Sequence, residues 1–263
     1  MTTDTFSETW SSGSYPDIAK NYLPIAGSLV ERTNVTDDDT VLDVGCGTGN
    51  VAITAARRGA AVTGIDINET MLGHARENAA FVGVDDIEWE RGNVTDLSVD
   101  ADTCDVTLSC FGHMYGDPPE ASARELLRVT KPGGRIAFTS WTPTDLYPFM
   151  AGVLSTYLDP EDVPEFTEPP FMWGDSSVVE SRLGDDVESI AFDTASIAYP
   201  ALSPEHFWRE MATKSGTFVV FLDLVPEDDR GDLREEMVET IQPYFDDRRN
   251  AVELEYLLTT ATV

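Results

Sequence analysis

Three alternate glycines constrain this chain more than any other feature, because they stand between an apolar run and a helical pattern. Val41 to Gly45 has the composition of a buried strand, Cys46 to Gly49 forms a glycine-rich turn, and residues 51–58 have a helical pattern that ends at Gly59. Glycines let a backbone approach a ligand closely, and a helix N-terminus offers free N–H groups. This segment predicts an α/β fold with a ligand-binding loop after its first strand.

The spacing of the glycines excludes two common phosphate-binding loops. A dinucleotide fingerprint that starts at Gly45 needs glycine at position 50, but Asn50 stands there. A P-loop ends in Gly-Lys followed by Ser or Thr, and no lysine lies near this loop. Asp66 closes a second strand over residues 61–66, where an acid can accept hydrogen bonds from ribose hydroxyls. Together these features indicate an adenosine-like ligand without a pyrophosphate.

The rest of the first half continues the alternation of strands and helices. Asn68 is placed to cap the helix that follows the second strand. Residues 87–90 alternate between apolar and charged side chains and predict an edge strand, and the fourth and fifth strands are expected over residues 105–110 and 135–141. Asp117, followed by two prolines, predicts the N-cap of a helix.

Four motifs, in this order, resemble those of class I S-adenosylmethionine-dependent methyltransferases: VLDVGCGTGN, VTGIDIN, RGNVTDL and LLRVTKPGGRIAF. They cover roughly residues 40–141. The resemblance implies a Rossmann-like three-layer α/β sandwich with a seven-stranded, mostly parallel sheet whose last strand is antiparallel, and with a small cap. It also implies S-adenosylmethionine as the cofactor.

The resemblance implies roles for residues around the cofactor. The loop glycines would line its methionine part, with Asp43 supporting the loop. Asp66 would hold the ribose, Ile67 would pack on adenine, and Asn93 would accept a hydrogen bond from the adenine amino group, helped by the backbone of Val94. The complete set is Asp43, Gly45, Cys46, Gly47, Gly49, Asp66, Ile67, Asn93, Val94, Cys110, Phe111 and Tyr15. The alternatives are that the loop is only a tight turn, that Asp66 is a capping acid, and that Asn93 stabilises a turn.

Residues near the transferred methyl group are expected just after the fourth strand. Cys110 and Phe111 would border the sulfonium and the acceptor, and Tyr15 lies in an N-terminal arm of the kind that closes over the cofactor in this family. His113 is the candidate general base, because its ordinary pKa of about 6.5 suits proton transfer at neutral pH. The alternative is a loop histidine without such a role, because many methyl transfers need only alignment.

The second half of the chain predicts a cap and the remaining strands. We expect an N-terminal arm over residues 1–34, a cofactor-binding core over 35–141, a cap insertion over 142–186 and sheet-completing strands and helices over 187–263. Eight aromatic residues are candidates either for an apolar acceptor pocket or for the core: Trp10, Tyr15, Phe171, Trp173, Phe207, Trp208, Phe218 and Phe221.

The charge of the chain is strongly unbalanced. Its 263 residues include 48 acidic and 17 basic side chains, a formal net charge of −31. Like charges at this density destabilise a compact chain in dilute buffer, but ~1 M salt shortens the screening length to about 3 Å. We therefore expect a halophilic source. A nucleic-acid partner is disfavoured, because binding to phosphates depends on Lys and Arg.

Sequence features also limit localisation and metal binding. No run approaches the roughly 18 apolar residues that span a bilayer, and the N-terminal residues do not resemble a signal peptide. The three cysteines lack a C-x-x-C spacing and the three histidines lie far apart, so no metal site is expected. We expect a cytoplasmic protein that does not associate with membranes, and its oligomeric state is left open.

The function expected from these observations is transfer of a methyl group from S-adenosylmethionine to a small acceptor, with an apolar molecule as a candidate. Two alternatives remain. A methyltransferase for a macromolecule, protein or RNA, would need a basic docking patch, for example around Arg57, Arg58 and Arg91 or around Arg248 and Arg249. A non-catalytic regulatory protein would bind S-adenosylmethionine without turnover.

Overall fold

The sheet of this protein is seen in a computed structural model that describes residues 8–263. Its strands run in the order β3-β2-β1-β4-β5-β8-β6, and a short β7 also pairs with β8. The first five strands pair in parallel, and β8 lies antiparallel between β5 and β6. The strands are β1 (Thr40–Val44), β2 (Ala61–Asp66), β3 (Ile87–Arg91), β4 (Cys104–Cys110), β5 (Thr130–Trp141), β6 (Ser189–Pro200), β7 (Phe245–Asp246) and β8 (Ala251–Thr262).

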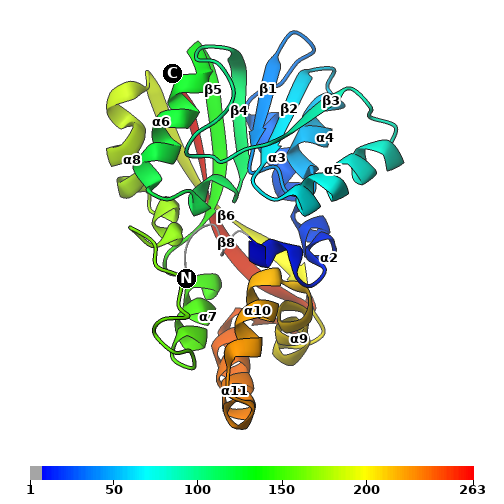
Figure 1. Ribbon diagram of the computed structural model, residues 1–263, viewed down its shortest axis with the longest axis vertical. Coiled ribbons are helices and arrows are strands. Elements are labelled where there is room, and N and C mark those ends of the chain that lie inside the picture. The colour runs from blue at the N-terminus through cyan, green and yellow to red at the C-terminus, as the bar shows by residue number, and fades with distance from the viewer. Residues whose placement is uncertain (1–7) are drawn as a thin grey trace.

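Helices cover both faces of this sheet and make a three-layer sandwich. Helices α3, α4 and α5 lie on one face, and α6 and α8 lie on the other (Figure 1). The Rossmann-like fold and the antiparallel last strand are confirmed, and the two-residue β7 makes the sheet eight-stranded instead of seven-stranded. The helices are α2 (Tyr15–Ala19), α3 (Leu23–Arg32), α4 (Asn50–Ala56), α5 (Glu69–Phe81), α6 (Pro119–Val129), α7 (Leu146–Ser155), α8 (Ser176–Leu183), α9 (Pro204–Lys214), α10 (Gly216–Leu224) and α11 (Arg230–Ile241).

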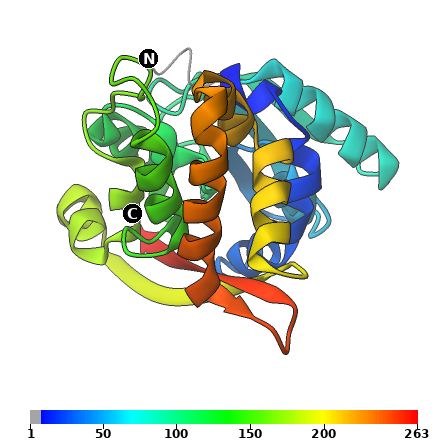
Figure 2. The same ribbon diagram turned by 90° about the horizontal axis from the view of Figure 1, so that it is seen from below.

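A second group of helices lies below the carboxyl ends of the parallel strands. This group consists of α7, α9, α10 and α11, reached by the lower ends of β6 and β8 (Figure 1). Seen from below, α11 lies between α7 and α9 and contacts both (Figure 2). The cap is therefore built from two segments. Helix α8, which we expected in the cap insertion 142–186, packs beside α6. From the segment 187–263, α11 packs against α7, and α9 packs against both α10 and α11.

Local chemistry explains where several elements begin. The side chain of Asn68 caps α5 as expected, because its Oδ1 accepts hydrogen bonds from the N–H groups of Thr70 and Met71. Strand β3 is at the edge of the sheet, as its alternating pattern predicted. The N-cap of α6 is Pro118 and not Asp117, which was a wrong expectation. The Asp117 carboxylate instead accepts a hydrogen bond from the N–H of Thr167, 2.9 Å away.

Strand β5 begins earlier in the chain than its residue composition indicated. We expected β5 to start at Arg135, but it starts at Thr130, immediately after α6. The buried hydroxyl of Thr130 donates to the carbonyl of Leu126 and shares a 2.7 Å hydrogen bond with Thr107 of β4. This pairing joins the end of α6 to the sheet. No helix within residues 8–263 has the length and apolar character needed to cross a membrane.

Candidate functional site

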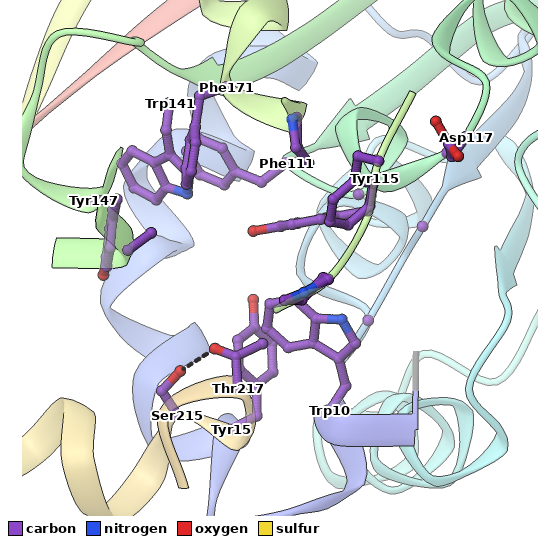
Figure 3. Close-up of a pocket in the computed structure, with 18 of the residues that line it drawn as sticks. Trp10, Tyr15, Phe111, Tyr115, Asp117, Trp141, Tyr147, Phe171, Ser215 and Thr217 are labelled. Atoms are coloured by element: carbon purple, nitrogen blue, oxygen red, sulfur yellow. Dashed lines mark hydrogen bonds between the residues drawn. The ribbon is translucent and has the colours of Figure 1, made fainter. Parts of the chain in front are cut away.

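A cavity of about 750 Å³ opens where the parallel strands end. Asp66, Cys110 and Trp141 are the last residues of β2, β4 and β5, and all three line it. Ligands bind at this edge in open α/β sheets, because the loops that follow neighbouring strands diverge there. Figure 3 shows the cavity between aromatic side chains of the N-terminal helices, the strand ends and the cap.

The loop after β1 adopts a conformation that only glycine accepts easily. Gly45, Gly47 and Gly49 have φ values of 65°, 53° and 84°. A Cβ atom at Gly45 would lie 2.6 Å from the Cα of Gly112, so the loops after β1 and β4 touch through their backbones. At Gly47 the position of a Cβ is open, with a ring carbon of Tyr15 as its nearest neighbour at 4.0 Å. The Gly47 backbone therefore faces the cavity.

Asp66 is anchored by two backbone groups beside this loop. One carboxylate oxygen accepts from the N–H of Gly47 and the other from the N–H of Asn68, each at 2.8 Å. Burial raises the pKa of Asp66, and the two hydrogen bonds partly oppose that rise. A carboxylate has about four acceptor positions. The side chain can therefore hold the loop and still accept hydrogen bonds from a ligand in the cavity.

Asp43 supports the loop from behind. Its side chain is buried and does not line the cavity. One oxygen accepts from the N–H of Ala52 at 2.9 Å, and the other finds no partner among residues 8–263. Burial raises its pKa to about 7. Cys46 and Gly49 also lie behind the cavity wall, and a Cβ at Gly49 would lie 2.8 Å from the ring of Trp89.

Ile67, Asn93 and Val94 line the cavity beyond Asp66. The side-chain oxygen of Asn93 accepts from the N–H of Thr95 at 3.0 Å, and its carbonyl accepts from the N–H of Asp96 at 3.0 Å. Asn93 therefore stabilises a turn while its side chain borders the cavity. The oxygen retains a second acceptor position for a ligand amino group.

Cys110, Phe111 and Tyr15 also line the cavity. Burial raises the pKa of the Cys110 thiol to about 12, and the hydroxyl of Thr139 donates to its sulfur at 3.6 Å. The thiol is therefore protonated at neutral pH. Tyr15 packs edge-on against Trp10, with ring centroids 5.1 Å apart, below the cavity in Figure 3.

His113 is not brought to the cavity, in contrast to the role of general base considered for it. Its backbone N–H donates to Ser109 Oγ at 3.0 Å, which turns the residue back toward the buried end of β4. The imidazole is fully buried between the rings of Phe138 and Trp173. Its Nε2 lies 3.3 Å from the hydroxyl of Ser140. Burial, assisted by the charge of Arg182, lowers its pKa to about 3. His113 is therefore neutral and packed inside.

The aromatic candidates divide between the cavity and the core. Trp10, Tyr15, Phe171, Phe218 and Phe221 line the cavity, whereas Trp173, Phe207 and Trp208 are buried elsewhere.

The sequence reasoning missed Tyr22, Trp141 and Tyr147, which line the cavity from the N-terminal arm, the end of β5 and α7. Only the position of Trp141 at a strand end gave a signal for this role. The two tyrosines come from segments without a recognisable motif.

Comparisons with known proteins agree with this geometry. Residues 41–134, which hold the glycine loop and Asp66, match a family described as methyltransferase domain. Uncharacterized protein Rv1403c of Mycobacterium tuberculosis is 33% identical over 187 residues, covering 71% of this chain and 67% of that protein. The chain belongs to the same protein family as Rv1403c, and its own residues 41–134 match a methyltransferase domain.

Other similarities extend over nearly the whole chain. Uncharacterized protein Rv1405c of Mycobacterium tuberculosis is 29% identical over 266 residues, covering 96% of this chain and 92% of that protein. The structure of geranyl diphosphate methyltransferase in complex with S-adenosylmethionine has a TM-score of 0.54 and 17% identity, with 92% of this chain and 85% of that chain covered. The class I methyltransferase fold is thereby confirmed, and S-adenosylmethionine is the cofactor of this class of domain.

Proposed function

We propose that this protein transfers the methyl group of S-adenosylmethionine to a small, apolar molecule enclosed in the cavity. The proposal is supported by a single cavity that extends from the glycine loop to a group of aromatic side chains. At one end it is lined by Gly45, Gly47 and Asp66, and at the other by Trp141, Tyr147 and further apolar side chains. Such a cavity can hold a polar cofactor and an apolar acceptor side by side.

The cofactor end has the groups that S-adenosylmethionine needs. The open backbone of Gly47 would receive the methionine part, and Asp66 would accept hydrogen bonds from the ribose hydroxyls. Ile67 would pack on adenine, and Asn93 and Val94 would border its amino edge. The loop conformation would be stabilised from behind, without contact to the cofactor, by Asp43, Cys46 and Gly49.

The chain contributes mainly alignment and exclusion of water. When bound, S-adenosylmethionine supplies an electrophilic methyl group on a sulfonium, which an in-line nucleophile displaces. Cys110 and Phe111 would border this methyl group at the end of β4. Tyr15 and Trp10 would close the cavity from the N-terminal side. Holding two reactants in a near-attack geometry can supply much of the rate enhancement, so a buried, neutral His113 is consistent with catalysis.

A small acceptor is supported over a macromolecule by the enclosure of the site. Helices of the cap and the N-terminal arm contribute residues to the cavity wall, including Tyr15, Tyr147 and Phe218. Of the arginines that could have formed a basic patch, Arg249 forms an ion pair with Glu253, and Arg91 donates to the carbonyl of Ile67. These two arginines are occupied, and the net charge of −31 disfavours association with a phosphate backbone.

Calorimetric titration of S-adenosylmethionine and S-adenosylhomocysteine in molar KCl tests the proposal. We expect micromolar binding to the wild type and loss of binding in Asp66→Ala. Asp185→Ala is the matched control, because Asp185 is exposed and does not line the cavity. Absence of binding to the folded wild-type protein would overturn the proposed function. Equal losses in the two variants would show that Asp66 does not hold the ribose.

A further inference from the structure

We propose that the methyl acceptor is an uncharged molecule with an aromatic or similarly flat apolar ring system and one oxygen-bearing polar group, and that it carries no phosphate, sulfonate or other fixed anion. This inference rests on the proposed function and specifies the substrate class of the same cavity. Three features carry it: a stacked aromatic wall, the charges that line the cavity, and a pair of tyrosine hydroxyls.

The aromatic wall is preassembled on the acceptor side. Phe111 and Trp141 stack with ring centroids 3.8 Å apart and an interplanar angle of 6°, and Tyr22 meets both rings edge-on. Tyr147 lies against Trp141 at 4.8 Å. Figure 3 shows Trp141, Phe111 and Phe171 together on one side of the cavity. A fixed array of ring faces and edges favours a flat apolar partner, which can stack or pack edge-on without reorganising the wall.

The charges that line the cavity are all negative. Its ionisable acids are Asp66, Asp117 and Glu165, and no Lys, Arg or His within residues 8–263 lines it. A buried anion without a cationic partner loses hydration that nothing replaces, and carboxylates in the same cavity add repulsion.

A diphosphate acceptor therefore does not fit this cavity. The likeness in fold to geranyl diphosphate methyltransferase does not extend to that substrate.

A pair of tyrosine hydroxyls adds a polar position to the aromatic wall. The hydroxyls of Tyr22 and Tyr147 lie 2.7 Å apart, and the Tyr147 hydroxyl donates to Met211 Sδ at 3.7 Å. All three residues line the cavity. A thioether is a weak acceptor, so a hydroxyl, ether or carbonyl oxygen of a ligand would form a stronger hydrogen bond with the same proton. This pair of hydroxyls accounts for the oxygen-bearing polar group that we assign to the acceptor.

A pair of fluorescent probes tests the exclusion of anions. N-phenyl-1-naphthylamine is neutral, and 1-anilinonaphthalene-8-sulfonate has the same ring system with a fixed anion. Each would be titrated in molar KCl into protein saturated with S-adenosylhomocysteine, which fills the cofactor end. We expect the neutral probe to bind at least about tenfold more tightly, a difference of about 1.4 kcal/mol. Equal or tighter binding of the sulfonate, or no binding of the neutral probe, would overturn the inference.

A charge introduced at the wall provides the matched control. Ser155 lines the cavity from α7, whereas Thr144 is exposed and lies outside it. Ser155→Arg should tighten binding of the sulfonate probe by about tenfold, because a desolvated guanidinium pairs with it. Thr144→Arg adds the same charge elsewhere and should leave both affinities unchanged. Equal effects of the two variants would contradict binding of the probes within the cavity.

The tyrosine pair is tested by removing one hydroxyl and keeping its ring. We expect wild-type protein loaded with S-adenosylhomocysteine to bind 1-naphthol more tightly than naphthalene, and Tyr147→Phe to abolish that preference. A preference that survives in Tyr147→Phe would overturn the assigned polar contact. Binding of S-adenosylhomocysteine is measured in the same samples. If that ligand binds and the ring probes do not, this inference fails while the proposed function stands; if it does not bind, the proposed function fails.

Discussion

The ring of Phe111 stacks in parallel on the ring of Trp141, although Phe111 holds a left-handed backbone conformation with a φ of 64°. A bulky residue adopts this conformation only where its surroundings enforce it, at a cost of about 1–3 kcal/mol. The N–H of Phe111 donates to the carbonyl of Thr139 at 3.1 Å, which fixes the backbone beside β5. This strained backbone conformation directs the aromatic ring of Phe111 to the end of β4, where the acceptor and the methyl group would meet.

Two substitutions at Phe111 separate the energetic cost of the backbone conformation from the contribution of the aromatic ring. Phe111→Ala and Phe111→Gly both remove the stacking, but only glycine adopts a positive φ without steric penalty. We expect Phe111→Gly to be more stable than Phe111→Ala by about 1 kcal/mol, although glycine is normally the less favourable residue. Urea unfolding in molar KCl measures the difference. A less stable glycine variant would show that the backbone at position 111 is not strained.

Substitution at Gly47 tests whether its open face belongs to the cofactor. Gly47 and Gly83 both have positive φ values, 53° and 71°, and a Cβ at either position meets no atom closer than 4 Å. Each alanine variant should lose about 1 kcal/mol of stability. Only Gly47→Ala should weaken binding of S-adenosylmethionine, by about tenfold or more, because its methyl group enters the cavity. Similar affinities in both variants, measured by calorimetry, would contradict this assignment.

The buried carboxyl of Asp43 makes stability depend on pH. Its pKa is about 7 in the folded protein, whereas an unfolded aspartate ionises near pH ~4. Its contribution is therefore fully present below about pH 4 and is lost as the pH rises through about 7. Asp43→Asn keeps an oxygen for the N–H of Ala52 and removes the titration.

The difference in unfolding free energy, wild type minus Asp43→Asn, should thus fall by up to about 1.4 kcal/mol per pH unit across this range. Urea unfolding of both proteins at several pH values checks the slope. A difference that does not change between about pH 4 and about pH 7 would mean that Asp43 ionises normally in the folded protein.

The net charge of −31 predicts that salt stabilises the fold. Repulsion between carboxylates is screened over about 3 Å at ~1 M salt, so the thermal midpoint should rise between ~0.1 M and molar KCl. Sucrose at matched osmolality is the control, because it favours compact states without screening charge. If KCl raises the midpoint no more than sucrose does, repulsion between charges does not limit stability.

The end of the cavity beside the glycine loop could be predicted from the sequence because its chemistry is local. Gly45, Gly47 and Asp66 lie within a single strand–loop–helix–strand unit, and neighbouring parallel strands necessarily bring their carboxyl ends together. Asn93 and Phe111 follow the next strands and Cys110 ends one of them, so all three reach the same cavity for the same reason. The order of the motifs therefore determined the fold class and one half of the cavity.

The acceptor end could not be predicted in this way. Tyr22, Tyr147 and Phe218 come from the N-terminal arm and from two cap helices that are widely separated in the chain. No periodicity distinguishes an aromatic residue of a cavity wall from one of the core. The cap is built from helices that precede β6 in the chain and from helices that follow it. Residue composition alone did not indicate this combination.

The position of the His113 side chain also could not be predicted from the sequence. Its position two residues beyond Phe111 suited proton transfer, but a hydrogen bond to Ser109 and packing against Phe138 place the ring inside the sandwich. The sequence by itself determined the sheet, the glycine loop and the acid beside it, because each depends on neighbouring residues and on strand order. Only the tertiary structure decided which aromatic rings face the cavity and which histidine is buried, because both depend on contacts between segments far apart in the chain.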